Sequence, residues 1–341
     1  MQLLTERVVR TPRHTTFHLD AGMADAPLLI FLHGWPELAI SWRHQLRCFA
    51  DLGFRVVAPD MRGYGRSTVH PRRTDYAMEA IVADMLELLA ALGRARCIWV
   101  GHDWGSAVVW SLAQHHPQRV EGLASLCVPY IPEGFAPANL IPLVDRAIYP
   151  EDAYPAGQWD YQLYYEEHFD AASATFEAHP VNFVKAMFRK GNPKAVGKPA
   201  RLASIRRDGG WFGGAGTPPD VPLDTDLLTE EDLHRYASAL AANGMAGPDA
   251  WYANAAANIA YARSAPGGAR LAMPVLFFHA AYDTTCDTVG RALAEPMRAH
   301  CADLTELTLP TGHWMAQERP ELVNAGLARW LALKFPQRWP V

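Results

Sequence analysis

Residues 101–105, which read Gly-His-Asp-Trp-Gly, constrain the fold of this chain more than any other stretch. An apolar run at 97–100 precedes them, and a helical pattern at 107–113 follows them. A nucleophile placed between two small residues, at the junction of a strand and a helix, is the pattern of a nucleophile elbow. We expect the two glycines to permit a strained turn that lifts Asp103 above a sheet. The alternative is a plain turn in which Asp103 caps the helix.

The central residue of this elbow is aspartate, where serine is usual. A carboxylate suits attack on an alkyl carbon better than attack on an acyl carbon. The backbone N–H of Trp104 would open the following helix, where anions are favoured. The stretch therefore predicts a carboxylate nucleophile beside an oxyanion donor.

Apolar runs and helical patterns alternate through much of the chain. After an opening hairpin near 8–19, strands are predicted at 27–32, 54–58, 97–100, 120–127, 274–278 and 304–309. Helices are predicted at 40–52, 78–92, from the elbow to about 116, 289–299 and 320–333. This alternation predicts an α/β fold with a mostly parallel central sheet flanked by helices on both faces.

The alternation stops between Pro132 and Pro266, where no run looks like a strand. Helical stretches such as 163–174 and 180–188 alternate there with loops, and the loosest loop, 190–222, has a glycine-rich centre. We interpret this part as a helical cap with one mobile flap. The predicted organisation is a core at 1–130, a cap at 131–268 inserted after the sixth strand, and the rest of the core at 269–341.

Two further polar residues follow predicted strands of the core. Asp283 comes after the strand that ends at Phe278, and His313 comes after the next strand. Both should therefore lie at the same sheet edge as Asp103, in the order nucleophile, acid, histidine. We interpret Asp283 as the acid that orients His313, and Asp287 as a helix cap. Glu133 is the nearest carboxylate to the alternative acid position after the sixth strand.

Composition narrows the class of function. A net charge of -5 gives no indication of nucleic-acid binding. No apolar run approaches the roughly 20 residues of a membrane span, and the first residues lack the apolar stretch of a secretion signal. The 5 cysteines have no CxxC spacing, which favours reduced thiols and a cytoplasmic protein.

The chain resembles the α/β-hydrolase-fold epoxide hydrolases of the soluble type. An HGxP signature occurs at 33–36 and continues into Glu37, and the stretches 41–43 and 60–67 also match that family. In the cap, 160–164 resembles the first tyrosine motif of the family and 251–254 the second. The resemblance points to Tyr161 and Tyr252 as donors to the epoxide oxygen, with Tyr164 and Tyr165 as competitors for the first position.

The resemblance implies a two-step hydrolysis of a small lipophilic epoxide to a vicinal diol. Asp103 would attack an epoxide carbon and form a hydroxyalkyl ester, and His313, oriented by Asp283, would activate the water that hydrolyses it. The backbone N–H groups of Trp35 and Trp104 would hold the oxyanion. The reaction would need no metal and no organic cofactor. A homo-oligomer is compatible with the sequence.

Two other functions use the same elements. A haloalkane dehalogenase also has aspartate followed by tryptophan, but it usually has asparagine where this chain has Trp35, and it lacks the paired tyrosines. A non-catalytic hydrolase-fold protein that binds a small ligand would not need Asp103, Asp283 and His313 together. His14 and His18 share one strand face without a third metal ligand, so we interpret them as ordinary strand residues.

Overall fold

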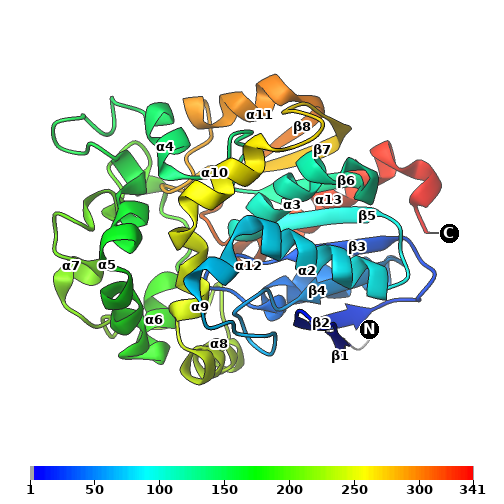
Figure 1. The fold of residues 1–341 in the computed structure, drawn as a ribbon, viewed down its shortest axis with the longest axis horizontal. Coiled ribbons are helices and arrows are strands. Elements are labelled where there is room, and N and C mark those ends of the chain that lie inside the picture. Colours follow the sequence, from blue (N-terminus) through cyan, green and yellow to red (C-terminus); the bar gives the residue numbers. More distant parts are fainter. Residues whose placement is uncertain (1–3, 341) are drawn as a thin grey trace.

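The central sheet has eight strands in the order β1-β2-β4-β3-β5-β6-β7-β8 (Figure 1). It belongs to a computed structural model that describes residues 4–340; the first three residues of the segment considered for a secretion signal lie outside the described residues. The strands are β1 (Thr5–Arg10), β2 (Thr15–Ala21), β3 (Leu28–Leu32), β4 (Arg55–Pro59), β5 (Cys97–His102), β6 (Val120–Leu126), β7 (Leu271–Ala280) and β8 (Cys301–Leu309). Only the pairs β1–β2 and β2–β4 are antiparallel, which confirms the predicted, mostly parallel sheet.

The central strands are apolar along their whole length because both of their faces are covered. Every residue of β3 and of β5 is buried. Pairing Leu32 with Gly101, and Leu126 with Phe278, brings the carboxyl ends of β3, β5, β6 and β7 to one edge of the sheet. The loops after these four strands therefore meet in space.

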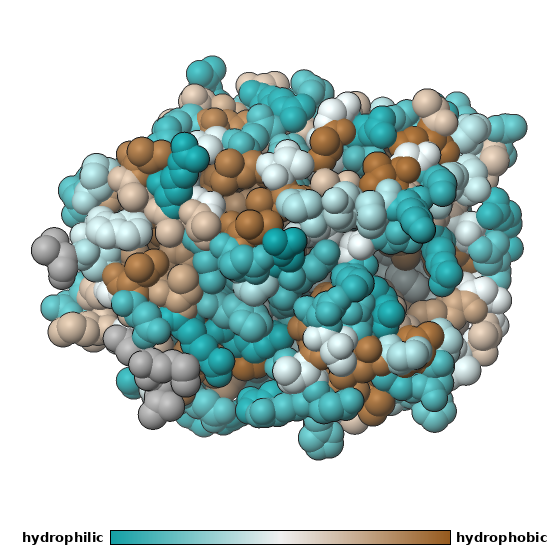
Figure 2. Space-filling model, turned by 180° about the vertical axis from the view of Figure 1, so that it is seen from behind, coloured by the Kyte–Doolittle hydropathy of each residue, from teal (hydrophilic) through white to brown (hydrophobic). Residues whose placement is uncertain are grey.

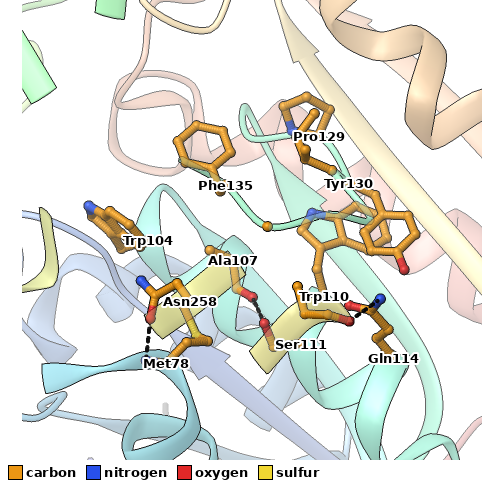
Figure 3. Close-up of a pocket in the computed structure, with 13 residues that line it drawn as sticks. Met78, Trp104, Ala107, Trp110, Ser111, Gln114, Pro129, Tyr130, Phe135 and Asn258 are labelled. Atoms are coloured by element: carbon orange, nitrogen blue, oxygen red, sulfur yellow. Dashed lines mark hydrogen bonds between the residues drawn. The ribbon is translucent and has the colours of Figure 1, made fainter. Parts of the chain in front are cut away.

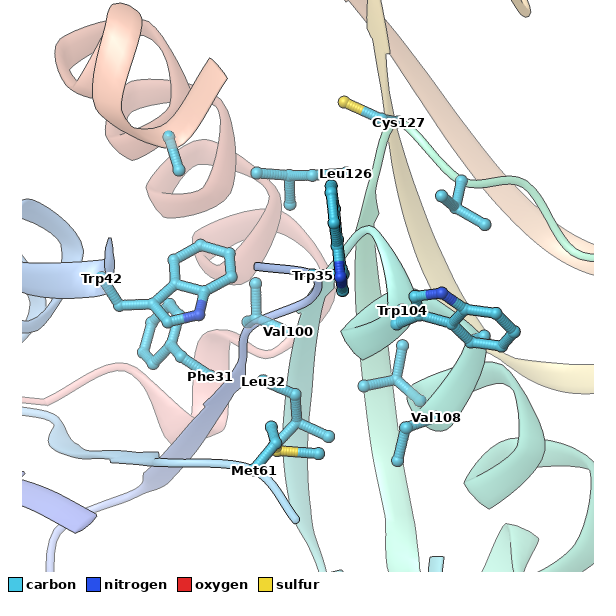
Figure 4. Packing of buried hydrophobic residues seen from close by; sticks show 14 of the residues in the cluster. Phe31, Leu32, Trp35, Trp42, Met61, Val100, Trp104, Val108, Leu126 and Cys127 are labelled. Carbon is cyan, nitrogen blue, oxygen red and sulfur yellow. The ribbon is translucent and has the colours of Figure 1, made fainter. Parts of the chain in front are cut away.

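Helices cover both faces of the sheet. The longer helices of the core are α1 (Arg43–Asp51), α2 (Met78–Ala91), α3 (Trp104–His115), α11 (Glu295–His300) and α13 (Pro320–Lys334), with the short α12 (Met315–Glu318). Contacts of α2 with α3 and of α1 with α13 place these two pairs on opposite faces (Figure 1). Between the sheet and the helices lie side chains that are fully buried, among them Phe31, Leu32, Val100 and Val108 (Figure 4).

One predicted helix begins later than expected. The pattern at 289–299 forms a turn up to Arg291, then η9 (Ala292–Ala294) and α11. Gly290 has φ +67°, a conformation that does not continue a helix, whereas Pro296 stands in the first turn of α11, where proline is favoured. Our prediction that Asp287 caps a helix was therefore wrong. Its carboxylate instead binds the Arg291 guanidinium at 3.0 Å.

Residues 127–270, all of them described, form helices and loops and no strand. The helices are α4 (Pro137–Leu140), α5 (Asp160–Glu177), α6 (Pro180–Met187), α7 (Trp211–Gly214), α8 (Glu230–Asn243), α9 (Ala246–Asp249), η8 (Ala250–Ala253) and α10 (Ala255–Arg263). Most of these helices gather at the end of the sheet where the carboxyl ends of the strands lie (Figure 1).

The surface and the thiols are unremarkable. Large exposed apolar side chains such as Met23, Val181 and Leu333 are far apart in the chain, and the face in Figure 2 mixes apolar and polar residues. All five cysteines are free thiols. In the described part of the chain, no helix is both long and apolar enough to span a bilayer.

Candidate active site

The turn between β5 and α3 holds Asp103 in a conformation that few residues other than glycine adopt. Asp103 has φ +51°, whereas neither Gly101 nor Gly105 has a positive φ. A Cβ added to Gly105 would lie 2.1 Å from the Leu32 carbonyl oxygen, and one added to Gly101 would lie 2.5 Å from the carbonyl oxygen of Gly105. The glycines therefore provide room for α3 to lie close to the sheet, and the strain of the turn falls on Asp103 itself.

The two carboxylate oxygens of Asp103 face different groups. The Trp35 backbone N–H donates to Oδ1 at 2.7 Å, and His313 Nε2 lies 3.6 Å from Oδ2. A Cβ on Gly34 would lie 2.3 Å from Oδ1 and 2.7 Å from the Trp104 backbone nitrogen. Both backbone nitrogens thus border the Asp103 carboxylate, and only glycine fits between them.

Asp283 and His313 form the expected pair at the ends of β7 and β8. His313 Nδ1 lies 2.6 Å from Asp283 Oδ2, while the backbone N–H groups of Thr285 and Cys286 donate to Oδ1 at 2.8 and 3.0 Å. Burial opposes both charges, yet the pKa of Asp283 is lowered because His313 and these N–H groups stabilise its anion. Burial also opposes the charge of His313, but Asp283 and Asp103 stabilise the imidazolium and raise the pKa of His313 well above its usual value.

A second buried pair, Glu37 and His102, lies behind His313. His102 Nδ1 is 2.6 Å from Glu37 Oε2, and His102 Nε2 donates to the His313 carbonyl oxygen at 2.8 Å. Although burial opposes both charges, the pKa of Glu37 falls to about 2 and that of His102 rises to about 10, because each stabilises the other. The pair is therefore ionic. We did not foresee it from the sequence, although His102 beside the nucleophile and Glu37 after the HGxP signature were both available signals.

One group of side chains has the composition of a metal site. His102, Cys127 and His313 offer ligand atoms within 4.8 Å of one another. However, the Cys127 thiol donates to the His313 carbonyl oxygen at 3.2 Å, and His102 donates to the same atom. The Cys127 thiol and the His102 ring thus both bind the carbonyl oxygen of His313, so hydrogen bonding accounts for the cluster.

Tyr161 and Tyr252 come together although they belong to different elements. Tyr161 lies in the first turn of α5 and Tyr252 in η8, and their ring centroids are 5.6 Å apart. Both side chains are buried. Burial is the main cause that raises the pKa of both phenols, and nearby groups that include Asp103 raise it further. Tyr252 also packs edge-on against Trp104, with ring centroids 5.2 Å apart. Both phenols thus lie over the elbow in their neutral form.

The neighbouring tyrosines of α5 have other surroundings. Tyr165 stacks on Tyr252 at 4.6 Å, and its buried hydroxyl has no hydrogen-bond partner in the described residues. Tyr164 packs against His168, 5.0 Å away between ring centroids. By contrast, the Tyr161 hydroxyl accepts a hydrogen bond from Gln162 at 3.2 Å. The structure therefore brings Tyr161, rather than Tyr164, toward Tyr252 and Asp103.

A small cavity of about 10 Å³ borders Asp103. Its lining comprises Asp103, Trp104, Ala107, Val128, Phe135, Tyr161 and Cys286. A second cavity of about 30 Å³ shares Trp104, Ala107 and Phe135 with it and follows α3 toward Gln114 (Figure 3). On the other side of the triad, Asp283 and His313 border an open cleft of about 940 Å³. Asp103 thus lies between a small, mostly apolar cavity and the wide polar opening that His313 borders.

The glycine-rich centre of the expected flap packs into the site. Trp211 is buried and lies 6.0 Å from Trp35 and 6.1 Å from Tyr161, between ring centroids. Phe212 has φ +56° and is flanked by Gly210 and Gly213, which also have positive φ. The glycines therefore shape a tight turn that presents one aromatic side chain inward.

Comparison with known proteins gives a consistent result. The profile of the family described as alpha/beta hydrolase fold matches residues 27–320. Epoxide hydrolase A of Mycobacterium tuberculosis is 31% identical over 332 residues, which cover 96% of this chain and 97% of that protein. Bifunctional epoxide hydrolase 2 of Sus scrofa is 31% identical over 314 residues, or 91% of this chain and 52% of the porcine protein.

Solved structures agree with these sequence matches. The crystal structure of Epoxide Hydrolase A from Mycobacterium thermoresistibile superposes with a TM-score of 0.79 at 30% identity. The alignment covers 96% of this chain and 98% of the crystallised one. Similarity therefore extends through the core and the helices that cover it.

Proposed function

This chain belongs to the epoxide hydrolases of the α/β-hydrolase fold, and from this premise we propose that Asp103 is the nucleophile of its reaction. The enzyme converts an epoxide and water to a vicinal diol through a hydroxyalkyl ester of an aspartate. One observation carries the assignment. The Asp103 carboxylate lies between the Trp35 N–H on one oxygen and His313 on the other, beneath two buried phenols.

The two oxygens of Asp103 have different roles in this proposal. Oδ1 already accepts the Trp35 N–H, so it becomes the carbonyl oxygen of the ester. Oδ2 accepts no backbone N–H and attacks the epoxide carbon. As the new C–O bond forms, the bond from that carbon to the epoxide oxygen breaks, and its electron pair moves onto the oxygen.

Tyr161 and Tyr252 hold that oxygen as charge develops on it. An alkoxide is a poor leaving group, so a phenol must donate a proton as the bond breaks. The buried phenols keep their protons until then, because their environment raises the pKa of both. One phenol transfers its proton to the oxygen while the second donates a hydrogen bond, and the proton that His313 loses once the ester has formed restores the first phenol.

His313 acts in the second step. While Asp103 is charged, it helps to keep the imidazolium form of His313, and conversion of Asp103 to an ester removes that charge. The pKa of His313 should therefore fall when the ester forms, which prepares the imidazole to take a proton from water. The hydroxide attacks the ester carbonyl, the Trp35 and Trp104 N–H groups hold the oxyanion, and collapse releases the diol and Asp103.

The rest of the proposal concerns the setting of the site. We propose that residues 131–268 form a cap that closes over the sheet edge, and that the substrate is a small lipophilic epoxide. The apolar rings of Trp104 and Phe135 beside Asp103 support an apolar substituent, which must displace neighbouring side chains because the two cavities there measure only about 10 and 30 Å³. A carboxylate, an imidazole and two phenols supply all the proton transfers, so we expect no cofactor. Five free thiols support a cytoplasmic location.

The dehalogenase alternative gains no support from Trp35. A halide site needs indole N–H groups that point at the leaving group. The Trp35 indole N–H instead donates to Asp249 at 2.9 Å. The Trp35 indole N–H is therefore not directed at a halide, and of Trp35 and Trp104 only Trp104 is left to donate its indole N–H to one.

A trapped intermediate tests the proposal. His313→Gln should form the ester and fail to hydrolyse it, because no base activates water. We expect intact-protein mass spectrometry to show one added epoxide mass, on the peptide that contains Asp103. The wild type should turn over and show no stable adduct.

Two controls make this test decisive. Asp103→Ala in the same background should abolish the adduct, and a bromoalkane should give neither adduct nor bromide. A His313→Gln protein that folds but gains no mass with an epoxide would overturn the ester mechanism at Asp103. Bromide release without diol formation would reinstate the dehalogenase.

A further inference from the structure

Asp249 is a carboxylate that the reaction does not use, yet it is fully buried beside the residues that do the chemistry. Its side chain is 0% exposed. The Trp35 indole N–H donates to Oδ1 at 2.9 Å, and the Ser173 hydroxyl donates to Oδ2 at 2.7 Å. A buried carboxylate without a cation is costly, so its retention calls for a physical reason.

The two hydrogen bonds join three separate elements of the site. Ser173 lies on α5 after a kink at His168, and Tyr161 lies in the first turn of α5, before that kink. Asp249 is the last residue of α9, and η8 with Tyr252 follows directly. Trp35 lies in the loop after β3 and gives its backbone N–H to Asp103. One carboxylate thus connects both tyrosine-bearing elements with the loop that holds the nucleophile.

Aromatic packing around Asp249 extends the connection. Tyr165 of α5 stacks on Tyr252 at 4.6 Å with an interplanar angle of 8°. Tyr252 in turn packs edge-on against Trp35, with ring centroids 6.0 Å apart. A shift of α5 or of η8 would therefore disturb the Trp35 ring as well as the phenols.

We propose that Asp249 is a positioning residue that holds Tyr161 and Tyr252 in register with the Trp35 N–H and the Asp103 carboxylate. This inference rests on the proposed roles of those four residues. Asp249 does not touch the epoxide. It acts by joining the cap elements to the loop after β3, so that both phenols face the oxygen released by attack at Asp103.

The charges around Asp249 make this joint sensitive to pH. Burial raises the pKa of Asp249 to about 7, against the hydrogen bonds of Ser173 and Trp35 and the nearby phenol of Tyr165, and Glu177 of α5 raises it further. Tyr64 of the core also faces it, as does Tyr165, and Asp249 raises the pKa of both phenols. Ionisation of Asp249 places a negative charge near the phenols that must stabilise an alkoxide, so ester formation should slow as pH rises through neutrality.

The test separates ester formation from ester hydrolysis. Styrene oxide is mixed with enzyme in a stopped-flow instrument, and quenching of tryptophan fluorescence reports the ester. Asp249→Asn keeps the size of the side chain but removes the charge and one acceptor. We expect its rate of ester formation to fall about tenfold at pH 6. Hydrolysis should fall less than about threefold, because the turn that holds Trp35 is also closed by the hydrogen bond from Glu37 N to Gly34 O.

Two further variants keep the test informative. Ser173→Ala removes one hydroxyl and should slow ester formation about threefold even if Asp249→Asn fails to fold. Asp232→Asn is the matched control, because Asp232 is another buried cap carboxylate, joined to Arg43 of the core at 3.0 Å. It should leave both rates unchanged.

The pH profile supplies the readout that a merely structural role would not change. In the wild type, ester formation should slow between about pH 6 and 8, and this dependence should be absent from Asp249→Asn. Wild-type rates and profile in both Asp249→Asn and Ser173→Ala would overturn this inference and leave the proposed function intact. Absence of any ester phase in the wild type would overturn the proposed function, and this inference with it.

Discussion

The core half and the cap half of the site are built by different means. In the core half, backbone atoms position the reacting groups. Asp103 stands at a strained turn, and the N–H groups of Trp35, Thr285 and Cys286 bind the carboxylates of Asp103 and Asp283. In the cap half, side chains position one another. Tyr161 and Tyr252 are held by ring packing and by contacts with other buried side chains.

This difference predicts how each half responds to change. Backbone donors have fixed directions, so the core half tolerates almost no displacement and should fail abruptly when crowded. Packed rings can readjust, and two phenols share one oxygen, so the cap half should fail by degrees. Substitutions matched across the two halves therefore test whether the core half and the cap half differ in this way.

The largest effect is expected from Gly34→Ala in the core half. The new Cβ would lie 2.3 Å from Asp103 Oδ1 and 2.7 Å from the Trp104 backbone nitrogen, neither of which can move away easily. We expect kcat/KM to fall at least about 1,000-fold, because the Asp103 carboxylate must leave the Trp35 N–H. The cost in stability should stay near 1–3 kcal/mol, as for other overpacked sites. Steady-state kinetics and urea denaturation measure the two effects.

Gly267→Ala is the control, since a Cβ there meets nothing within 4 Å. It should change neither activity nor stability by a measurable amount. If Gly34→Ala retained more than about a tenth of the wild-type activity, the carboxylate would have room to move, and the contrast between the two halves would be wrong.

A smaller effect is expected from the phenols of the cap half. Tyr161→Phe and Tyr252→Phe should each slow ester formation about 10- to 100-fold, because the remaining phenol still donates to the oxygen. The double variant should lose at least about 1,000-fold, and ester hydrolysis should be unchanged in all three. Single-turnover stopped-flow kinetics separate the two steps.

Tyr165→Phe is the matched control for the phenols. It keeps the ring that stacks on Tyr252 and removes a hydroxyl without a hydrogen-bond partner in the described residues. Its rate should stay within about twofold of the wild type. A larger loss with Tyr165→Phe than with Tyr161→Phe would move the donor role four residues, or about one turn, along α5.

The core half could be predicted from the sequence because it depends on local patterns. Apolar runs set the strands, and a parallel sheet brings their carboxyl ends to one edge, so Asp103, Asp283 and His313 had to lie near one another. The predicted helix at 289–299 was wrong at its start because Gly290 and Pro296 act on the backbone more strongly than the apolar pattern does.

The cap half was predictable only in part. Resemblance pointed to Tyr161 and Tyr252, yet three tyrosines stand close together at the start of α5, and nothing local distinguishes them. The distinction comes from partners distant in the chain, such as Asp103, which borders the same cavity as Tyr161, and Tyr252, which stacks on Tyr165. Asp249 was missed for the same reason, since its partners Trp35 and Ser173 lie 214 and 76 residues away in sequence.

A further contrast concerns stability rather than rate, between a buried ion pair of the core and a lone carboxylate of the cap. His102 has a pKa raised from 6.5 to about 10, so its contribution to folding is complete below pH 6.5 and is lost as pH rises toward 10. Asp249 has a pKa raised from 3.8 to about 7, so folding favours its protonated form, and stability falls as pH rises from 4 to 7. Across its pH range, each change in the free energy of unfolding should be on the order of 4–5 kcal/mol.

Two variants should remove these slopes separately. Glu37→Gln takes the counter-charge from His102 and should flatten the free energy of unfolding between pH 6.5 and 10, at a cost in stability at lower pH. Asp249→Asn should flatten it between pH 4 and 7 and leave the alkaline slope in place. Urea denaturation from pH 4 to 10 measures both slopes. If Asp249→Asn instead flattened the alkaline range, the two buried groups would be exchanging protons, and core and cap would form one electrostatic unit rather than two.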